Sequence, residues 1–393
     1  MSLIRDAISD FLHKADLVLL ALCTAASLYG IALIYSACRY DATLHGNPLK
    51  QALCLVLGII CYFILTYLDM DVIMERWKWI FAASVGFILL LRTPLGVAGT
   101  TGNLNWLDIP GIPFMIQPAE IVKLSFVLLM ARQLVWLQQS HRGISAPASV
   151  IQAGLHFCFM AGLIVVISGD MGMAVVYTGI FIIMLWAAGV HRGWFLGGFA
   201  GAAAVVAVAV RVLPSTSYWT DYRIMRFRVL FDHDLDPLGA GWQQTRAMLA
   251  LGSGGLFGQG YLNGTQTQAA YSSSLPERQT DFIFSVCGEE LGLVGCAVIL
   301  LLLAAIILRC FYVGLRSRSP FSALVAIGFG GMLLVQTALN VGMCLYVAPV
   351  IGITLPFFSY GGSSLLTMFV AMGIVSGIKM RSLPSWLKDR SNF

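Results

Sequence analysis

Residues 275–309, LPERQTDFIFSVCGEELGLVGCAVILLLLAAIILR, pass from a polar turn directly into a long apolar run. The apolar part is long enough to cross a lipid bilayer as a helix, which takes roughly 20 residues. Asp281 stands where the polar part ends. The sequence therefore places a carboxylate at a membrane surface.

Apolar runs of this length recur along almost the whole chain. Of its 393 residues, 58% are hydrophobic and 11% are charged, which leaves too little polar surface for a water-soluble globule. Alternating barrel strands are absent, so the runs predict helices. We expect one polytopic domain over residues 1–393. It would be an all-α integral membrane protein with about ten transmembrane helices, over 17–37, 51–68, 79–92, 119–137, 153–168, 171–190, 193–212, 285–309, 320–345 and 364–379.

The basic residues set the expected orientation. If every span crosses, the connections that carry them fall on one side, which the positive-inside rule assigns to the cytoplasm. These residues are Arg5, Lys14, Arg76, Lys78, Arg142, Arg192, Arg316, Arg318, Lys379, Arg381, Lys388 and Arg390. Both termini are then cytoplasmic, and the connections 93–118, 213–284 and 346–363 are extracytoplasmic. The net charge of +5 thus reflects topology and contact with membrane lipids, not nucleic-acid binding.

The longest connection, 213–284, is a long extracytoplasmic loop between the seventh and eighth helices. Its segment 222–232 mixes arginines with apolar residues, which is typical of a helix that lies in the membrane interface. Residues 242–251 predict another short helix, ended by the glycines at 252–255. In the seventh helix, Gly193, Gly197 and Gly201 share a face on which another helix is expected to pack closely.

Asp281 has two interpretations. Thr280 or Asp281 could cap the helix expected to begin at Phe282, because both side chains accept hydrogen bonds from first-turn amides. A carboxylate beside Glu277 and Arg278 at the membrane boundary could also act as a general base, if desolvation tunes its pKa. Spacing alone favours capping, and the two roles are compatible.

Glu120 and Lys123 form a second candidate site. They stand three residues apart on the fourth span, after Pro118 at a first-turn position, and so share one helix face. Ionisable groups inside a membrane helix are costly, so a functional role is the first hypothesis and a structural ion pair is the alternative. Arg132 and Asp170 are expected to be structural.

The stretch 349–364, PVIGITLPFFSYGGSS, is a third candidate. Its two prolines and three glycines break any helix, so its backbone groups must face water or protein. We expect an external re-entrant loop that lines a cavity. Gln336 and Asn340, one turn apart in the preceding span, would face the same cavity.

Together these stretches resemble the SEDS family of shape, elongation, division and sporulation proteins, which includes RodA, FtsW and SpoVE. The similarity extends over nearly the whole chain. It rests on the motifs IYS at 34–36, QPAEIVK at 117–123, GDMG at 169–172, DPLGAGWQ at 236–243, LPERQTDFIF at 275–284, EELG at 289–292, NVGM at 340–343 and the 349–364 loop. The GTQTQ at 264–268 leans towards the RodA-like members.

The resemblance implies a peptidoglycan glycosyltransferase that polymerises lipid II, the undecaprenyl-pyrophosphoryl disaccharide pentapeptide, at the outer face of the bacterial plasma membrane. The glycan strands would serve cell shape, division or sporulation. The family's essential aspartate corresponds to Asp281. By resemblance Asp281 takes the proton of the 4-hydroxyl of the acceptor's GlcNAc, whose oxygen attacks the donor's anomeric carbon with inversion. Undecaprenyl pyrophosphate is the leaving group.

The leaving pyrophosphate needs positive charge nearby, from a divalent cation such as Mg or Mn or from basic side chains. Lys123 ranks first because it matches the lysine of a family motif; no metal ligand is assigned, and no organic cofactor is implied. The residues expected at the substrate are Trp106, Glu120, Lys123, Arg246, Glu277, Arg278, Thr280, Gln336, Asn340 and Ser359. The family also implies a class B penicillin-binding protein, a transpeptidase, as partner.

Two other functions compete with this interpretation. A lipid II flippase, or another transporter of a lipid-linked substrate, would more often show inverted repeats and helices broken near the bilayer midplane. Here the polar residues gather in external loops instead. A catalytically silent scaffold for the transpeptidase is disfavoured by intact Asp281, Glu120 and Lys123. The enzyme is therefore the preferred interpretation.

Overall fold

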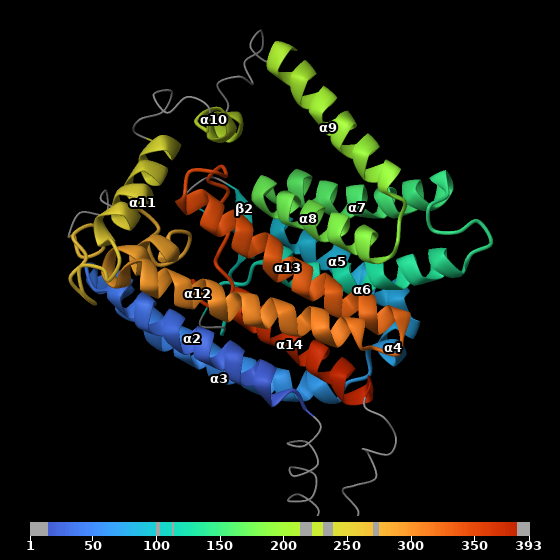
Figure 1. Cartoon of the computed structure of the whole chain (residues 1–393), viewed down its shortest axis with the longest axis horizontal. Coiled ribbons are helices and arrows are strands. Elements are labelled where there is room, and N and C mark those ends of the chain that lie inside the picture. The colour runs from blue at the N-terminus through green and yellow to red at the C-terminus, as the bar shows by residue number, and fades with distance from the viewer. Residues whose placement is uncertain are drawn as a thin grey trace, which may run out of the picture.

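The helices form one bundle, with a small hairpin at its side and one helix that leans away from it (Figure 1). The computed structural model describes residues 15–99, 103–111, 114–212, 222–230, 239–269 and 275–382. Four of the basic residues that orient the chain, Arg5, Lys14, Lys388 and Arg390, lie outside these ranges, as do parts of the 213–284 connection.

Each of the ten predicted helices is present, which confirms the fold class. Their bounds are α2 Leu17–Cys38, α3 Asn47–Tyr67, α5 Trp77–Leu89, α6 Pro118–Gln139, α7 Pro147–Ser168, α8 Met171–Ala187, α9 Arg192–Val212, α12 Ile283–Leu315, α13 Pro320–Cys344 and α14 Gly362–Ser382. Within the described ranges, six helices are long and apolar enough to cross a membrane by length and composition alone.

The remaining elements are short. They are η1 Ala42–Leu44, α4 Met70–Ile73, η2 Met74–Arg76, η3 Leu90–Arg92, β1 Gly96–Ala98, β2 Leu104–Leu107, α10 Tyr222–Arg228 and α11 Ala240–Gly254. Strands β1 and β2 pair antiparallel as a hairpin. Helices α10 and α11 are the two short helices predicted in the external connection, and α11 ends at the predicted glycines.

Proline marks the start of four helices. Helices α3, α6, α7 and α13 each carry a proline at one of their first two positions, where a first-turn amide would have no partner in the helix. Small residues then allow close approach. Where α14 lies along α3, a Cβ added to Gly373 would come within 2.7 Å of the carbonyl oxygen of Tyr62. Close approach at small residues is how helices associate in lipid, where no hydrophobic effect drives them together.

The close packing expected at Gly193, Gly197 and Gly201 is wrong for the part of the chain that the structure describes. Helix α9 runs away from the bundle (Figure 1), and a Cβ added at Gly197 or Gly201 would meet nothing within 4 Å. A small-residue face permits close packing but does not supply the neighbouring helix.

Helix α12 is broken at Gly292, whose φ of 66° and ψ of −163° are not helical. The 255–260 segment after α11 takes up the released backbone groups. Two of its amides donate to the carbonyls of Glu289 and Glu290, at 2.9 and 3.0 Å, and the amide of Leu293 donates back to one of its carbonyls at 3.0 Å. Backbone groups at membrane depth must find partners within the protein. The hydrogen bonds at this break therefore hold the external connection against α12.

Candidate functional site

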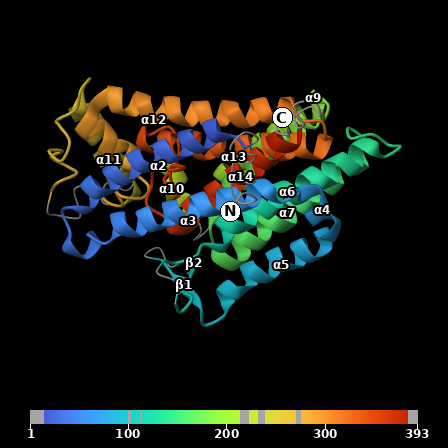
Figure 2. The same ribbon diagram turned by 90° about the horizontal axis from the view of Figure 1, so that it is seen from below.

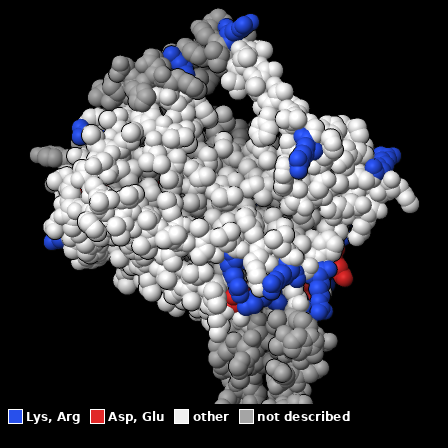
Figure 3. Space-filling view, in the orientation of Figure 1, with Lys and Arg blue, Asp and Glu red and all other residues white. Residues whose placement is uncertain are grey.

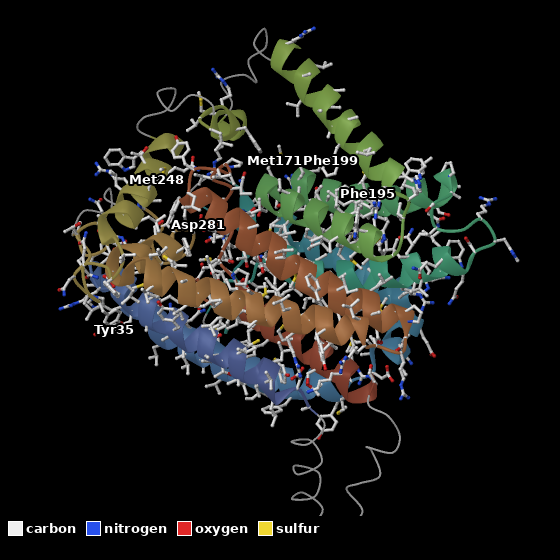
Figure 4. The ribbon with its side chains drawn as sticks, viewed as in Figure 1. Tyr35, Met171, Phe195, Phe199, Met248 and Asp281 are labelled. Carbon is white, nitrogen blue, oxygen red and sulfur yellow. The ribbon has the colours of Figure 1, made fainter. Side chains whose placement is uncertain are left out.

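Asp281 lies where the 275–282 turn, the 345–361 loop and the end of α13 meet (Figure 4). It is partly buried. Its backbone oxygen accepts a hydrogen bond from the side-chain nitrogen of Asn340 at 2.8 Å, and the same nitrogen donates to the carbonyl of Ile353 at 2.7 Å. Gln336, one turn earlier on α13, is fully buried, and neither polar atom of its side chain has a hydrogen-bond partner among the described residues. Asn340 thus joins the helix, the turn and the loop.

The 345–361 loop is non-helical, as its prolines and glycines predict, and it packs on the 275–282 turn. The hydroxyl of Ser359 donates to the carbonyl of Thr280 at 2.5 Å, and the amide of Tyr360 donates to the carbonyl of Gln279 at 2.8 Å. Gly352 has a φ of +68°, and a Cβ added there would lie 3.6 Å from Oδ2 of Asp281. Glycine at 352 therefore permits both the turn and the approach of the carboxylate.

The interpretation of Thr280 or Asp281 as the cap of α12 is wrong. The helix begins at Ile283, its N-cap residue is Phe282, and no side chain bonds to its free amides. Thr280 instead donates its hydroxyl to the carbonyl and to the carboxylate of Glu277, both at 3.2 Å. The carboxylate of Asp281 is therefore not engaged as a helix cap.

Charged side chains from its own turn and from two other segments act on Asp281. Burial raises the pKa of Asp281 to about 7, and the negative charge of Glu277 adds to the rise. Arg226 of α10 lowers this pKa, and Asp170, between α7 and α8, raises it. We call Asp170, Arg226, Glu277 and Asp281 the charge cluster. A carboxyl group whose pKa lies near neutrality is suited to proton transfer at physiological pH.

Asp170 has the structural role that the sequence predicts, and a second one. Its Oδ1 caps α8 by accepting from the amide of Met173 at 2.9 Å, and its Oδ2 accepts from the side chain of Gln117 at 3.3 Å. Burial raises the pKa of Asp170 to about 6, and the charge of Glu120 adds to the rise. Sequence reasoning did not place Asp170 at the site. The available signal was the GDMG motif, which lies between two spans on the expected extracytoplasmic side.

The predicted pair on α6 is formed. The Nζ atom of Lys123 lies 2.7 Å from Oε2 of Glu120, and both residues are buried. Glu120 is one turn inside α6 from Gln117, the residue that binds Asp170. The buried ion pair therefore lies directly beneath the charge cluster.

The other residues expected at the substrate are held as follows. Trp106 lies in β2 and pairs with Val97 of β1. The guanidinium of Arg246 stacks over the ring of Trp242, 3.8 Å from its centre, within α11. Glu277 is exposed, with a φ of +47°. That any of these side chains contacts substrate stays a prediction.

Arg278 is fully buried, and it clamps the external connection. Its guanidinium lies over the ring of Tyr40, 3.5 Å from the centre, and donates to the backbone carbonyls of Gln266, at 3.2 Å, and Thr267. The carboxylate of Glu289 accepts from the amides of the same two residues, at 2.7 and 2.8 Å. The peptide unit that joins Gln266 to Thr267 therefore has a cation on its carbonyl and an anion on its amide, the arrangement that its dipole favours. A substrate contact by Arg278 stays a prediction.

We expect Arg278→Met to loosen the 256–269 segment. The change leaves backbone carbonyls without their charged donor, and each such hydrogen bond contributes about 1.5–3 kcal/mol. Hydrogen exchange, read by mass spectrometry in detergent micelles, should speed up by about tenfold or more at the amides of this segment. Arg246→Met is the control, because its guanidinium stacks on Trp242 instead. Equal protection of the segment in both variants would contradict this role of Arg278.

The site offers carboxylates but not a resident metal centre. In the portion of the chain that the structure describes, no group of three or more His, Cys, Asp and Glu side chains could hold a metal ion. Mg²⁺ usually takes one or two carboxylates and completes its shell with water and substrate phosphates.

Comparison with protein families and curated proteins gives matches over nearly the whole chain. The family model of FtsW, RodA and SpoVE, described as a cell cycle protein, matches residues 16–383. The chain is 33% identical to the peptidoglycan glycosyltransferase MrdB of Escherichia coli strain K12, with 94% of each protein covered. It is 31% identical to the Stage V sporulation protein E of Bacillus subtilis strain 168, over 93% of this chain and 97% of that protein.

Solved structures share the same fold. A chain from a peptidoglycan synthase complex, in which polymerization and crosslinking are coordinated, matches with a TM-score of 0.76 and 27% identity, over 94% of this chain and 99% of the other. The rod shape determining protein RodA of Thermus thermophilus matches with a TM-score of 0.66 and 26% identity, over 94% and 98%.

Proposed function

The chain belongs to the FtsW/RodA/SpoVE family and is a peptidoglycan glycosyltransferase, and we propose that Asp281 is its general base. The activity rests on the family match over residues 16–383. The role of Asp281 is supported by its position: its carboxylate is partly buried, caps no helix and has a pKa of about 7.

In the proposed reaction the two substrates are lipid II and the undecaprenyl-linked glycan, one as acceptor and the other as donor. Asp281 takes the proton of the acceptor's 4-hydroxyl while that oxygen bonds to the anomeric carbon of the donor. The bond from this carbon to the pyrophosphate oxygen breaks, and undecaprenyl pyrophosphate leaves with the electron pair. The configuration at the carbon inverts. An alcohol needs a base in the transition state, whereas pyrophosphate leaves without an acid, so one carboxylate suffices.

Arg226 is our candidate for the positive charge that stabilises the leaving pyrophosphate. Lys123, which the sequence ranks first, is buried in its salt bridge with Glu120. Burial lowers the pKa of Arg226, and the carboxylates of Asp281 and Asp170 lie close enough to oppose that shift. An arginine can also bind a phosphate through two parallel hydrogen bonds. A divalent cation, Mg or Mn, would arrive on the pyrophosphate and supply further positive charge there.

The chain is a multi-pass bacterial membrane protein. We propose that it lies in the plasma membrane with both termini cytoplasmic and with Asp281 on the extracytoplasmic side, because the basic connections fall at the opposite ends of the spans. We also propose a class B penicillin-binding protein as its partner. The support is the likeness to a chain from a complex that coordinates polymerization with crosslinking.

Purified protein, with and without such a transpeptidase, tests the function directly. It is supplied with labelled lipid II and either Mg or Mn, and the products are separated on a gel. A ladder of glycan strands is expected. If no ladder forms with any partner or cation, the polymerase is excluded.

We expect the polymerisation rate to rise with pH up to about 7 and then to level off. Asp281 must be ionised to take a proton, and burial together with Glu277 places its pKa at about 7. Below that pH the rate should fall about tenfold per unit, since only the ionised fraction can act. Single-turnover rates over a range of pH measure the profile.

Two variants test whether the acidic limb of this profile reports the ionisation of Asp281. Glu277→Gln removes a negative charge that raises the pKa of Asp281, so the acidic limb should move to lower pH. Arg226→Gln removes a cation that lowers it, so the limb should move to higher pH. A flat profile, or shifts of the opposite sign, would contradict Asp281 as the base.

A further inference from the structure

A cavity lies at the other end of the bundle from Asp281. Its volume is about 780 Å³, and it is bounded by the 71–77 segment, α5, α6, α7 and the start of α13. Figure 2 shows α4, α5, α6 and α7 together on one flank of the bundle. The cavity reaches Pro320 at the start of α13, whereas Asp281 meets that helix at Asn340. At about 1.5 Å per residue the two places are about 30 Å apart.

The walls of this cavity are largely apolar, and several of the lining side chains are aromatic. They include Trp77, Phe81, Trp136, Phe159 and Phe321. Trp136 and Phe159 are also 57% and 48% exposed on the apolar outer surface of the bundle, so the cavity is continuous with the face that meets the lipid. A concave site of this size with apolar walls suits a ligand with a long apolar part.

Arg132 supplies the one cationic side chain of the lining. Its guanidinium lies 6.0 Å from the centre of the Trp77 ring, and it forms no salt bridge within the described residues. Asp71, at the mouth, does not pair with it. A charge in a membrane helix is costly unless an opposite charge offsets it. No acidic side chain among the described residues forms a salt bridge that would offset the charge of Arg132.

A second polar group of the lining also lacks a partner. The Nδ1 atom of His156 lies 2.7 Å from Oε1 of Gln133, whereas its Nε2 atom is buried with no hydrogen-bond partner in the described part of the chain. Because Nδ1 donates to the amide oxygen of Gln133, Nε2 of the neutral ring is a hydrogen-bond acceptor that suits a ligand hydroxyl. Of the two groups, Arg132 is the one that can bind an oxyanion on the wall of this apolar cavity.

We propose that this cavity binds one diacyl phospholipid, with its phosphate at Arg132 and its acyl chains against the apolar wall. An adjoining cavity of about 520 Å³ shares Trp136, Gln139 and Gln152 and adds Arg142, which extends the cationic surface for the headgroup. Figure 3 shows that Lys and Arg side chains gather at the end of the bundle where α4 lies, which attracts an anionic headgroup.

This lipid is not the substrate. In the proposed orientation it sits in the cytoplasmic leaflet, whereas the transfer takes place on the opposite face of the membrane. The site would stabilise the α5–α7 flank at the end of the bundle away from Asp281.

Native mass spectrometry of the full chain in detergent micelles tests the proposal, with dioleoyl phosphatidylglycerol as the probe. One molecule should stay bound, and dioleoylglycerol, which has no phosphate, should not. Arg132→Gln should lower the retained fraction about tenfold, the loss expected for a hydrogen-bonded charge. Arg76→Gln removes a basic side chain from the same end that does not line the cavity, and it should have no effect.

Trp136→Ala is a second variant. It removes an exposed part of the wall, so folding should be unaffected while lipid retention falls. Soluble glycerol phosphate, added in excess, should not displace the lipid, because it lacks the acyl chains. Equal retention of dioleoylglycerol, equal losses in the Arg132 and Arg76 variants, unchanged retention in Trp136→Ala, or displacement by glycerol phosphate would each overturn the proposal.

Discussion

Asp281→Asn is expected to lower the rate of glycan polymerisation by about 10²–10⁴-fold, the contribution of a positioned general base to a proton transfer. Asparagine keeps the size of the side chain and its place beside Gly352, but it cannot take a proton. The loss should appear in the single-turnover rate at saturating lipid II, because the base acts on the acceptor's hydroxyl and not on binding.

The variant should fold at least as well as the parent chain. Burial raises the pKa of Asp281, which means that the folded protein disfavours its charged form, and a neutral amide removes that penalty. An unchanged or higher melting temperature in micelles, combined with the lost rate, separates catalysis from stability. Asp170→Asn is the matched control: it removes a carboxylate of the same cluster and keeps the base. A glycan ladder that survives Asp281→Asn at full rate would remove the base assignment and leave the activity in place.

The helices were predictable because each depends on an apolar run that is local in sequence. Pro118 marked the start of α6, and the three-residue spacing of Glu120 and Lys123 was enough to predict their ion pair, which the structure confirms. The non-helical stretch at 349–361 was predictable for the same reason, since its prolines and glycines exclude a helix whatever lies around them. The prediction ran three residues too far, because α14 begins at Gly362.

Contacts between distant segments were not predictable in this way. Hydropathy cannot show that Asp170 acts on Asp281, because the two are separated by more than a hundred residues and meet only when α8 packs near the 345–361 loop. The hydrogen bonds that Arg278 and Glu289 form with the backbone of Gln266 were missed for the same reason. The break at Gly292 lies inside an apolar run, where a single glycine gives a weak signal. The cap predicted at Thr280 failed because that hydroxyl bonds to Glu277 instead.

Lys123→Met is expected to lower the free energy of unfolding by about 3–5 kcal/mol, because removing one partner of a buried ion pair leaves the other charge uncompensated. The Nζ atom of Lys123 is 2.7 Å from Glu120 and both side chains are buried, so neither can turn to water. Methionine has nearly the volume of the lysine stem and leaves little cavity. The predicted loss is therefore electrostatic, and denaturation in micelles measures it.

The double variant Glu120→Gln/Lys123→Met distinguishes a structural pair from a functional one. With both charges gone most of the stability should return, since replacing a buried pair by neutral side chains is often close to neutral. The pH dependence of activity should change if the pair also affects the electrostatics of the site. Glu120 raises the pKa of Asp170 and so keeps part of Asp170 uncharged, whereas the negative charge of ionised Asp170 raises the pKa of Asp281. Without Glu120, Asp170 is more fully ionised, so the stable double variant should keep a polymerisation profile whose acidic limb lies at higher pH. If the double variant is as unstable as Lys123→Met, the loss of stability is not electrostatic in origin. If the double variant is stable and its pH profile is unshifted, the pair serves only to stabilise α6.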